Sequence, residues 1–266
     1  NHVKRIKLID GKGDLIELEQ NKESEKFWAT IGGMGHTGII LEVTFNLIKI
    51  ESSYMKVDTL KYSNLESLMD AMNKNDEKYR YSVAWVDSLN NKGRGILTFG
   101  EHLKLNELDE ESIKIPLNVN LNPLAKSPQL PKGILNKFTV KAFNEFWYRK
   151  SPNIKTDENQ SIASFFHPLD SIDNWNFIYG PSGFLQYQFV VPYTEADIIF
   201  ETMYELRKIG APSFLTVLKK FGKSNNSHLS FPMEGWTLAA DIPIKLPGLF
   251  QLLNELDKKI INSGGR

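Results

Sequence analysis

The sequence predicts an α+β fold in which helices cover an antiparallel sheet. The chain has 266 residues, of which 41% are hydrophobic, so it can fill the core of one large domain or of two modest ones. Beyond residue 53, strand-like and helix-like patterns follow the order β-α-β-β, then α, then β-α-β-β-α. Strands that neighbour strands in this way are typical of an antiparallel sheet with helices on it, and no short-period repeat interrupts the order.

The first fifty residues predict a hairpin, a short helix and a long strand. Residues 3–9 and 15–18 are apolar stretches on either side of the turn Asp10-Gly11-Lys12-Gly13, whose two glycines supply positive φ angles. Residues 24–30 predict one short helix. Residues 39–50 are dominated by β-branched and aromatic side chains, which favours a strand along their whole length.

The middle of the chain predicts a helix, a strand pair and a long loop. Ser63, with Glu66 three positions later, forms a capping box at the start of a helix. Residues 79–86 and 95–99 then predict two strands. Residues 101–131 contain four prolines and an acidic run without any sustained period, so we expect a long loop there that is mobile or acts as a lid.

The remainder of the chain predicts helices and strands in turn. Residues 134–147 are apolar at near-helical spacing, and residues 184–191 form an aromatic and β-branched strand. Thr194 and Asp197 are expected to cap a helix that ends at Gly210. Two strands and a final helix with one apolar face complete the pattern, at residues 213–218 and 236–242 and around Leu249, Leu253, Leu256 and Ile260.

Composition excludes several classes of function. Thirty-two basic and 32 acidic residues leave a net charge of zero, so no overall field favours nucleic acid or an anionic membrane surface, and a site for any polyanion would have to be local. Cysteine is absent and the five histidines are too far apart for a helical ligand pair, so no metal site is expected. No apolar run approaches the roughly 20 residues that a membrane helix needs.

Residues 33–38, Gly-Met-Gly-His-Thr-Gly, fit the G-x-G-x-x-G pattern of a dinucleotide-binding turn. A Rossmann site requires the pattern to follow a strand and open a helix, whereas this one follows a helix-like segment and opens a strand. From the pattern alone, a tight turn in which the glycines merely permit the backbone geometry is an equally good interpretation.

The longer string FWATIGGMGHTGIILEV, from Phe27 to Val43, resembles the end of the FAD-binding domain in vanillyl-alcohol-oxidase-like flavoproteins. In that family the glycine turn and the first residues of the strand contact the flavin, largely through backbone atoms. The resemblance implies FAD as the cofactor, with Gly35, Gly38 and Ile40 as its contacts, and it assigns no role to His36.

The same resemblance implies a division of the chain into two domains. Residues 1–50 would be the C-terminal part of a PCMH-type FAD-binding domain, and residues 51–266 a truncated substrate-binding, or cap, domain. The boundary is expected at the polar segment 51–53, Glu-Ser-Ser.

Further strings over nearly the whole chain narrow the family. They include YSVAW at 81–85, FWYRK at 146–150, FHPLD at 166–170, GFLQYQFVVP at 183–192 and LSFP at 229–232. This colinear set resembles the decaprenylphosphoryl-ribose 2-oxidase family, whose members form the flavin subunit of a two-enzyme epimerase. A colinear set is far more specific than any single motif in this chain.

Two pairs of residues fit a sugar-phosphate pocket. Gln186 and Gln188 lie two apart on a strand, so on a buried face both amides can donate and accept toward sugar hydroxyls, although a polar outer face is the plain alternative. Lys219 and Phe221 share this spacing and offer a cation and an apolar wall, although a lone lysine on a strand is usually solvated. The family resemblance favours the pocket for both pairs.

Three further residues have open interpretations. As aromatic residues alone, Trp85 and Phe166 are more often core than site, but the matching positions in the family line the substrate cavity, and Phe166 replaces a tyrosine of close relatives. His167 has a side chain that titrates near neutrality and suits a catalytic base, whereas its place before Pro168 suits a structural role equally well.

The resemblance implies the chemistry of the parent protein. A secondary alcohol of a polyprenyl-phosphate-linked pentose, the ribose 2-hydroxyl, would become a ketone, and a separate NADH-dependent short-chain reductase would complete the 2-epimerisation. The pyrophosphate-binding loops would precede Asn1 and a catalytic lysine would follow Arg266, so the chain alone is expected to be inactive. The expected location is cytoplasmic or membrane-peripheral.

Two alternatives remain open at this point. One is another FAD-linked oxidase of the same superfamily, acting on a sugar lactone or an aldose. The other is a sugar-phosphate binding module that has no flavin.

Overall fold

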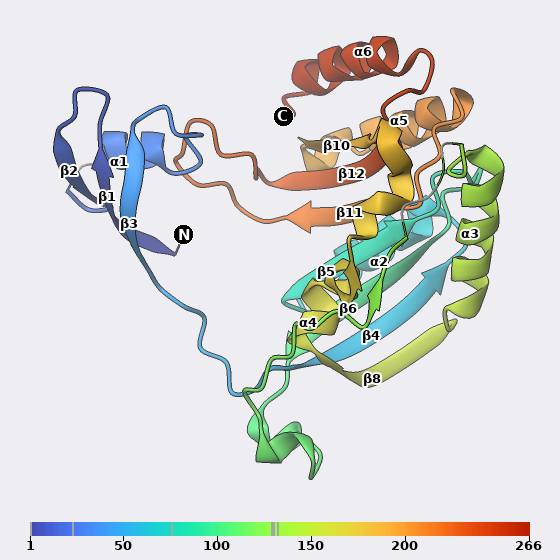
Figure 1. Ribbon diagram of the computed structural model, residues 1–266, viewed down its shortest axis with the longest axis horizontal. Helices are drawn as coiled ribbons and strands as arrows, with labels where there is room; N and C mark the ends of the chain where they lie inside the picture. The colour runs from blue at the N-terminus through green and yellow to red at the C-terminus, as the bar shows by residue number, and fades with distance from the viewer. Residues whose placement is uncertain (1, 23, 76, 129–130, 132) are drawn as a thin grey trace. The chain divides into compact units, whose positions relative to one another are not determined.

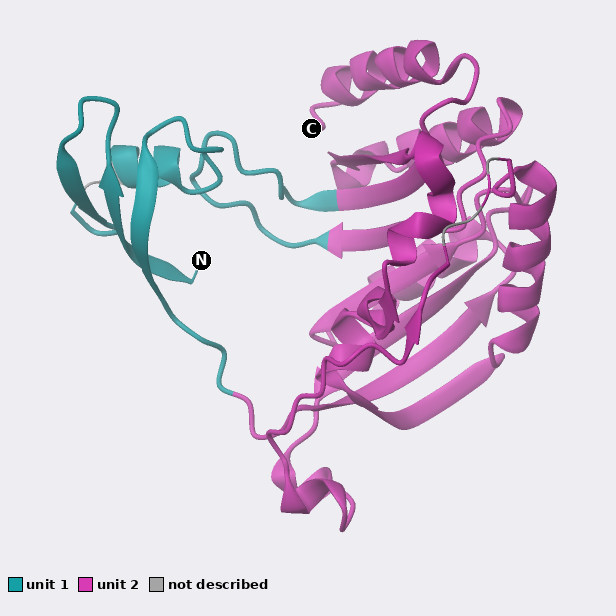
Figure 2. Cartoon of the chain, viewed as in Figure 1, with its two compact units in different colours: residues 1–49, 221–235 teal, residues 50–220, 236–266 magenta. Residues whose placement is uncertain are grey.

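The computed structural model describes residues 2–22, 24–75, 77–128, 131 and 133–266. The chain divides into two compact units (Figure 1, Figure 2), residues 1–49 with 221–235 and residues 50–220 with 236–266. The segment 221–235 leaves the second unit between two of its strands and is counted with the first. The order of predicted helices and strands along the sequence does not show that this segment is separate from the second unit.

The first unit contains the hairpin and the short helix that the sequence predicts, and the following strand joins the hairpin in a three-stranded antiparallel sheet. Its elements are β1 (Val3–Ile9), β2 (Leu15–Glu19), α1 (Ser24–Thr30) and β3 (Ile39–Phe45). β1 is the central strand and pairs with both others. Phe27 of α1 is buried with Ile6, Leu8 and Leu18, and these four side chains form a small core.

The predicted long strand over residues 39–50 is wrong in its length. β3 ends at Phe45, where it pairs with Val3, and Asn46 adds one more backbone hydrogen bond, to the carbonyl of His2. Residues 46–50 are not assigned to a strand, so their β-branched composition alone did not determine where β3 ends. The hairpin turn also uses only one of its glycines in the left-handed region, Gly13 at φ +89°.

The second unit is a seven-stranded antiparallel sheet with helices, which confirms the α+β class. The strand order is β10-β12-β11-β5-β6-β4-β8. The strands are β4 (Tyr54–Tyr62), β5 (Tyr81–Val86), β6 (Gly95–His102), β8 (Ile154–Ser161), β10 (Phe184–Val191), β11 (Thr216–Phe221) and β12 (Gly235–Pro243). The α-helices are α2 (Leu65–Asn75), α3 (Lys137–Lys150), α4 (Ile162–Phe166), α5 (Asp197–Lys208) and α6 (Leu249–Asn262).

Shorter elements connect this sheet and its helices. They are the parallel pair β7 (Ala125–Lys126) and β9 (Ile172–Asp173), and 3₁₀ turns at Leu105–Glu107, Ser112–Lys114, Pro168–Ser171, Trp175–Ser182 and Tyr193–Glu195. The predicted loop over residues 101–131 is therefore confirmed as lacking long elements, apart from the end of β6 and with residues 129–130 outside the described part of the chain. Its role as a lid stays a prediction.

One face of the large sheet carries the main hydrophobic core. Helices α2, α5 and α6 contribute apolar side chains such as Leu68, Met203 and Leu253, and the strands contribute side chains such as Phe189 and Leu238 to the same cluster. The apolar spacing that predicts these helices is therefore the spacing that attaches them to the sheet. In the described part of the chain, no helix has the length and apolar character that crossing a bilayer requires.

The structure also differs from the sequence predictions at β8 and at the starts of α2 and α5. β8 was not predicted because its sequence, IKTDENQS, is polar and without period, as befits an edge strand that pairs only with β4. At α2 the capping oxygen belongs to Asn64 rather than Ser63, and it accepts from the backbone N–H of Ser67 at 2.8 Å. At α5 no side chain caps the helix, because Thr194 lies in a preceding 3₁₀ turn.

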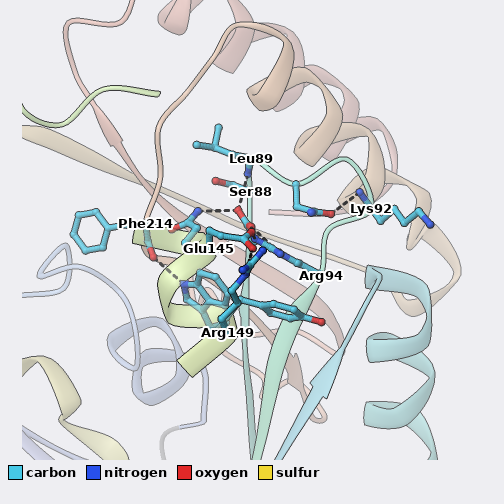
Figure 3. A network of polar contacts seen from close by, with 12 residues as sticks. Ser88, Leu89, Lys92, Arg94, Glu145, Arg149 and Phe214 are labelled. Carbon is cyan, nitrogen blue, oxygen red and sulfur yellow. Dashed lines mark hydrogen bonds and ion pairs between the residues drawn. The ribbon is translucent and has the colours of Figure 1, made fainter. Parts of the chain in front are cut away.

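A buried carboxylate attaches α3 to the ends of two strands (Figure 3). Asp87, which follows β5, lies 2.9 Å from Nη2 of Arg94 and accepts a hydrogen bond of 2.8 Å from Nδ2 of Asn144 on α3. Nη2 of Arg94 also lies 2.6 Å from Oε2 of Glu145, and the pKa of Glu145 is lowered by its hydrogen bond from Arg94. Ser88 adds a hydrogen bond of 2.9 Å to the carbonyl of Ser213. One charged group therefore organises α3, the β5–β6 connection and the approach to β11.

Replacing Asp87 by Ala is expected to destabilise the second unit by about 3 kcal/mol or more, because Arg94 and Asn144 lose a buried acceptor. The free energy of unfolding in urea measures this loss. Lys208→Ala is the matched control, since it breaks a pair with Glu205 whose lysine side chain is 63% exposed, and should cost under about 1 kcal/mol. Equal losses in the two variants would contradict the assigned role of Asp87.

Candidate functional site

Most of the candidate substrate residues lie on the face of the large sheet that points away from the core helices. Residues that face each other across antiparallel strands share one face, so Gln186 lies with its partner Asp241 and Gln188 with its partner Ala239. Their neighbours of opposite parity, such as Phe189 and Leu238, belong to the helix-covered core. The same parity places Tyr187 toward the helices, where its hydroxyl donates to Asp257 of α6 at 2.7 Å.

The central strands extend this face. Leu218 of β11 pairs with Ala84 of β5, and both side chains lie in the helix-covered core. Val217 pairs with Trp85, so these two point to the opposite face, and Lys219 shares the parity of Val217. Trp85 and Lys219 therefore lie on the same face as Gln186 and Gln188.

Two buried polar residues of β12 that were not predicted as site residues, Asp241 and Thr237, hold the two amides. Asp241 of β12 is 0% exposed and accepts from Nε2 of Gln186 at 2.9 Å and from the hydroxyl of Tyr179 at 3.3 Å. Nε2 of Gln188 donates to Oγ1 of Thr237 at 3.2 Å. Because an ionised carboxylate only accepts hydrogen bonds, Gln186 must turn its nitrogen toward β12 and its carbonyl oxygen away.

The exposure of the two amides leaves both interpretations of the pair open. Gln186 and Gln188 are exposed, so the polar outer face stays an alternative and their part in a pocket stays a prediction. The buried polar groups of this face belong instead to the neighbouring strand β12, as Thr237 and Asp241. The sequence does single out Asp241, because it is the one charged residue in the largely apolar strand β12. It also lies on the same side of the strand as Ala239 and Thr237, which are two and four residues before it.

Trp85 is connected to this polar group through aromatic contacts. Its Nε1 donates to the carbonyl of Phe214 at 2.8 Å, and the rings of Phe214 and Tyr179 stack with centroids 5.3 Å apart. Tyr179 in turn donates to Asp241. Trp85 and Gln186 thus belong to one continuous set of contacts, although 101 positions of sequence separate them.

Phe166 reaches the same face from α4. Its ring packs edge-to-face on Tyr81, with centroids 4.8 Å apart, and Tyr81 shares the parity of Trp85 on β5. The neighbouring ring of Phe165 covers Gly100, the residue that faces Tyr81 across the sheet. Phe166 is 39% exposed, so it forms part of a wall and not part of the core.

Phe221 shares the parity of Lys219 on β11, so it belongs to the same face of that strand. It is the last residue of β11 and the first of the segment counted with the first unit, where its ring packs edge-to-face on Phe231 with centroids 6.0 Å apart. The pairing of Lys219 with Phe221 in one pocket stays a prediction.

The candidate cofactor contacts lie in the first unit, in the turn between α1 and β3 and at the start of β3. The glycine turn opens a strand and not a helix, which confirms the exclusion of a Rossmann site. At Gly38, with φ +143°, an added Cβ would lie 2.2 Å from the carbonyl oxygen of Ile9, so the chain's own packing requires this glycine. At Gly35, with φ +80°, an added Cβ would meet no atom within 4 Å, and Ile40 is 46% exposed.

His167 lies beside a shallow pocket of about 340 Å³ that Leu121, Asp170 and Trp175 help to line. None of the candidate substrate contacts lines this pocket. Nδ1 of His167 is 3.5 Å from Oδ2 of Asp170, and the residue ends α4. This contact is compatible with both a structural role and a role as a base, so the assignment of His167 stays open. Among the residues that the structure describes, no three His, Asp or Glu side chains gather as a metal site.

Comparison with known proteins shows that the chain is homologous to an oxidase. It is 37% identical, over an alignment of 272 residues that covers its whole length, to decaprenylphosphoryl-β-D-ribose oxidase of Mycolicibacterium smegmatis. It is 25% identical over 277 residues to an uncharacterized protein in the mprA 5′ region of Streptomyces coelicolor, and that match covers 74% of the Streptomyces protein. No model of a known protein family matches the chain.

The chain is therefore a partial-length relative of decaprenylphosphoryl-β-D-ribose oxidase, and it spans 59% of the length of the mycobacterial protein. This confirms the resemblance inferred from the strings at residues 81–85, 146–150 and 183–192. The roles of individual residues stay predictions.

Asp241 is expected to make the stability of the second unit depend on pH. Burial raises the pKa of Asp241 above the ordinary value of 3.8, against the opposing effect of its hydrogen bonds from Gln186 and Tyr179. Between 3.8 and the raised pKa the folded chain holds a proton that the unfolded chain has lost, so stability falls as pH rises through this window.

Asp241→Asn removes this titration. The free energy of unfolding of the variant, relative to the natural chain, should therefore increase as pH rises through the window and then become constant. Urea unfolding of both proteins at a series of pH values measures the difference. A difference that does not change with pH would contradict the raised pKa.

Proposed function

We propose that this protein is an FAD-dependent oxidoreductase that oxidises the 2-hydroxyl of a polyprenyl-phosphate-linked pentose to a ketone. The observation that carries the proposal is the 37% identity over the whole chain to an oxidase named for decaprenylphosphoryl-ribose. A chemical argument supports it independently, because amide, cationic and aromatic side chains gather on one face of the sheet. A sugar with several hydroxyls and a phosphate requires these types of group.

The cofactor is assigned to the first unit. Residues 1–50 act as the end of a PCMH-type FAD-binding domain and residues 51–266 as the substrate-binding domain. The backbone at Gly35 fits a flat ring system, because its positive φ and the open space beside it permit close approach. Gly38 shapes the turn, and Ile40 offers an exposed apolar surface next to it. When bound, FAD supplies the acceptor for the hydride that leaves the sugar carbon.

The residues of the sheet face bind and orient the sugar. Gln186 presents its carbonyl oxygen to a sugar hydroxyl, because Asp241 holds its nitrogen. Thr237 likewise accepts a hydrogen bond from the side-chain nitrogen of Gln188, so the carbonyl oxygen of Gln188 is presented to the sugar. Lys219 neutralises the phosphate, and Trp85 and Phe166 form apolar walls that exclude water. Fixed orientation of the reacting carbon is the main contribution that such residues make to rate. We assign the base to none of the described residues.

The product of this reaction is a keto sugar, so a reductase must follow if the outcome is epimerisation. We propose an NADH-dependent short-chain reductase as that partner. An oxidase acting on a sugar lactone or aldose shares the flavin chemistry and differs only in the substrate. A binding module without flavin would use the same sheet face and carry out no redox reaction.

The intact protein is expected to show the two visible absorption bands of a flavin, and these should bleach when a phosphoribosyl lipid is added without oxygen. Bleaching by a lactone or an aldose alone would favour the alternative substrates. A colourless protein that takes up no added FAD would contradict the oxidase proposal and favour the binding module.

Within the same experiment, Gln186→Ala should slow bleaching by roughly tenfold at low substrate concentration, the cost of one lost hydrogen bond. Tyr187→Phe is its matched control, because Tyr187 is the next residue on β10 and faces the helices. Equal slowing in the two variants would mean that the effect comes from β10 as a whole and not from the sheet face.

Two glycine substitutions separate cofactor contact from folding. Gly35→Ala should cost only about 1–2 kcal/mol of stability, for a residue forced into the left-handed region, while it weakens FAD binding by contact with the ring. Gly38→Ala should unfold the first unit, because its Cβ would overlap the carbonyl of Ile9. Thermal unfolding and FAD titration measure the two effects. Undiminished FAD binding by Gly35→Ala would exclude Gly35 as a contact.

A further inference from the structure

The outward face of α3 carries aromatic side chains that the core does not use. Phe138 is 83% exposed and Phe146 is 60% exposed, and Phe143 and Trp147 are 44% and 42% exposed. Single exposed apolar residues are ordinary on a protein surface, but Phe138 and Phe146 are largely exposed on the same helix as Trp147 and Phe143, of which Phe143 also packs edge-to-face on Phe214 with centroids 5.8 Å apart. An exposed aromatic patch of this kind usually marks a surface that meets a partner.

The inner face of α3 is already fully engaged, so the patch is not needed for attachment. Val140 and Asn144 are buried, and Asn144 donates to Asp87. The hydroxyl of Tyr148 donates to the carbonyl of Tyr62 at 3.2 Å, and Glu145 pairs with Arg94. These contacts attach α3 to its own unit (Figure 1), and Figure 3 shows the part of the network around Arg94 and Glu145.

The charges of α3 indicate which partner the patch fits. The helix carries four basic residues, Lys137, Lys141, Arg149 and Lys150, and a single acidic one, Glu145. Glu145 is already paired with Arg94 and Arg149, which leaves a local positive excess in a chain whose net charge is zero. Nζ of Lys150 lies 5.8 Å from the ring centroid of Phe146, so cations and aromatic rings are interleaved.

A different exposed helix shows that this combination is specific to α3. The helix α6 also exposes an aromatic residue, Phe250, at 57%. Its charges are balanced, with Glu255 and Asp257 against Lys258 and Lys259. Exposure of an aromatic ring alone therefore does not distinguish α3, whereas the excess of positive charge does.

We propose that the outward face of α3 binds the surface of an anionic lipid bilayer. Helices that lie in the membrane interface carry Trp, Phe and Leu on the face that enters the boundary between headgroups and acyl chains, and lysine side chains keep their charge in water with their alkyl stems along the apolar surface. Interleaved cations and rings suit this surface better than a protein partner, whose interface core is usually depleted of lysine. The inference does not depend on the proposed oxidase activity, since Phe138 and Phe146, whose substitution tests it, are not among the candidate site residues.

Flotation of the intact protein with vesicles tests the inference. The protein should bind vesicles that contain phosphatidylglycerol and phosphatidylcholine, and bind poorly to phosphatidylcholine alone. Phe138→Ser with Phe146→Ser should weaken binding by roughly tenfold or more, from the loss of apolar contact. Lys141→Gln with Lys150→Gln should weaken it by at least about fivefold per charge.

Phe250→Ser with Lys258→Gln on α6 is the matched control and should bind like the natural protein. Thermal unfolding checks that each variant is folded, which its exposed positions favour. Unchanged binding by both α3 variants, or equal binding to neutral vesicles, would overturn the proposal. So would a dimer in sedimentation that becomes a monomer in the Phe138→Ser, Phe146→Ser variant without any vesicle binding, because the face would then meet a second copy of the chain.

Discussion

The alternation of side chains across the seven-stranded sheet is the constraint on which the second unit depends. Once α2, α5 and α6 cover one face and bury Phe189 and Leu238, every residue of opposite parity must point the other way. That single condition places Gln186, Gln188, Trp85 and Lys219 on one surface, although they come from three strands. The packing that forms the core therefore also determines which side chains lie together in the candidate site.

Two buried carboxylates show how the chain uses charge for different purposes. Asp87 is neutralised by Arg94 and serves to join α3 to the strand ends. Asp241 receives hydrogen bonds only from the neutral groups of Gln186 and Tyr179, so burial raises its pKa. A charge that lacks a counter-ion is costly to bury, and such groups occur more often at functional sites than in structural networks. This contrast makes Asp241 the more informative residue for function.

Homology and geometry give two separate kinds of support for the proposed oxidase. Identity of 37% to decaprenylphosphoryl-β-D-ribose oxidase concerns the whole chain and says nothing about which side chains meet the sugar. The sheet face identifies a set of side chains and says nothing about the reaction, because a binding module would need the same groups. The chain spans 59% of that relative. Both arguments therefore concern the residues proposed to bind the substrate, whereas the redox chemistry would be supplied by the cofactor.

The sequence by itself determined the class of fold, most of the strands and helices, the exclusion of a Rossmann turn and the relationship to the oxidase, because these depend on local periodicity and on colinear strings. It could not show where β3 ends, since a strand needs a partner, nor that β8 exists, since a polar edge strand has no apolar period. Nor could it show Asp241 beneath Gln186, a contact between residues 55 positions apart. Tertiary structure decided these points, because strand register and the burial of polar groups are set by partners distant in the chain.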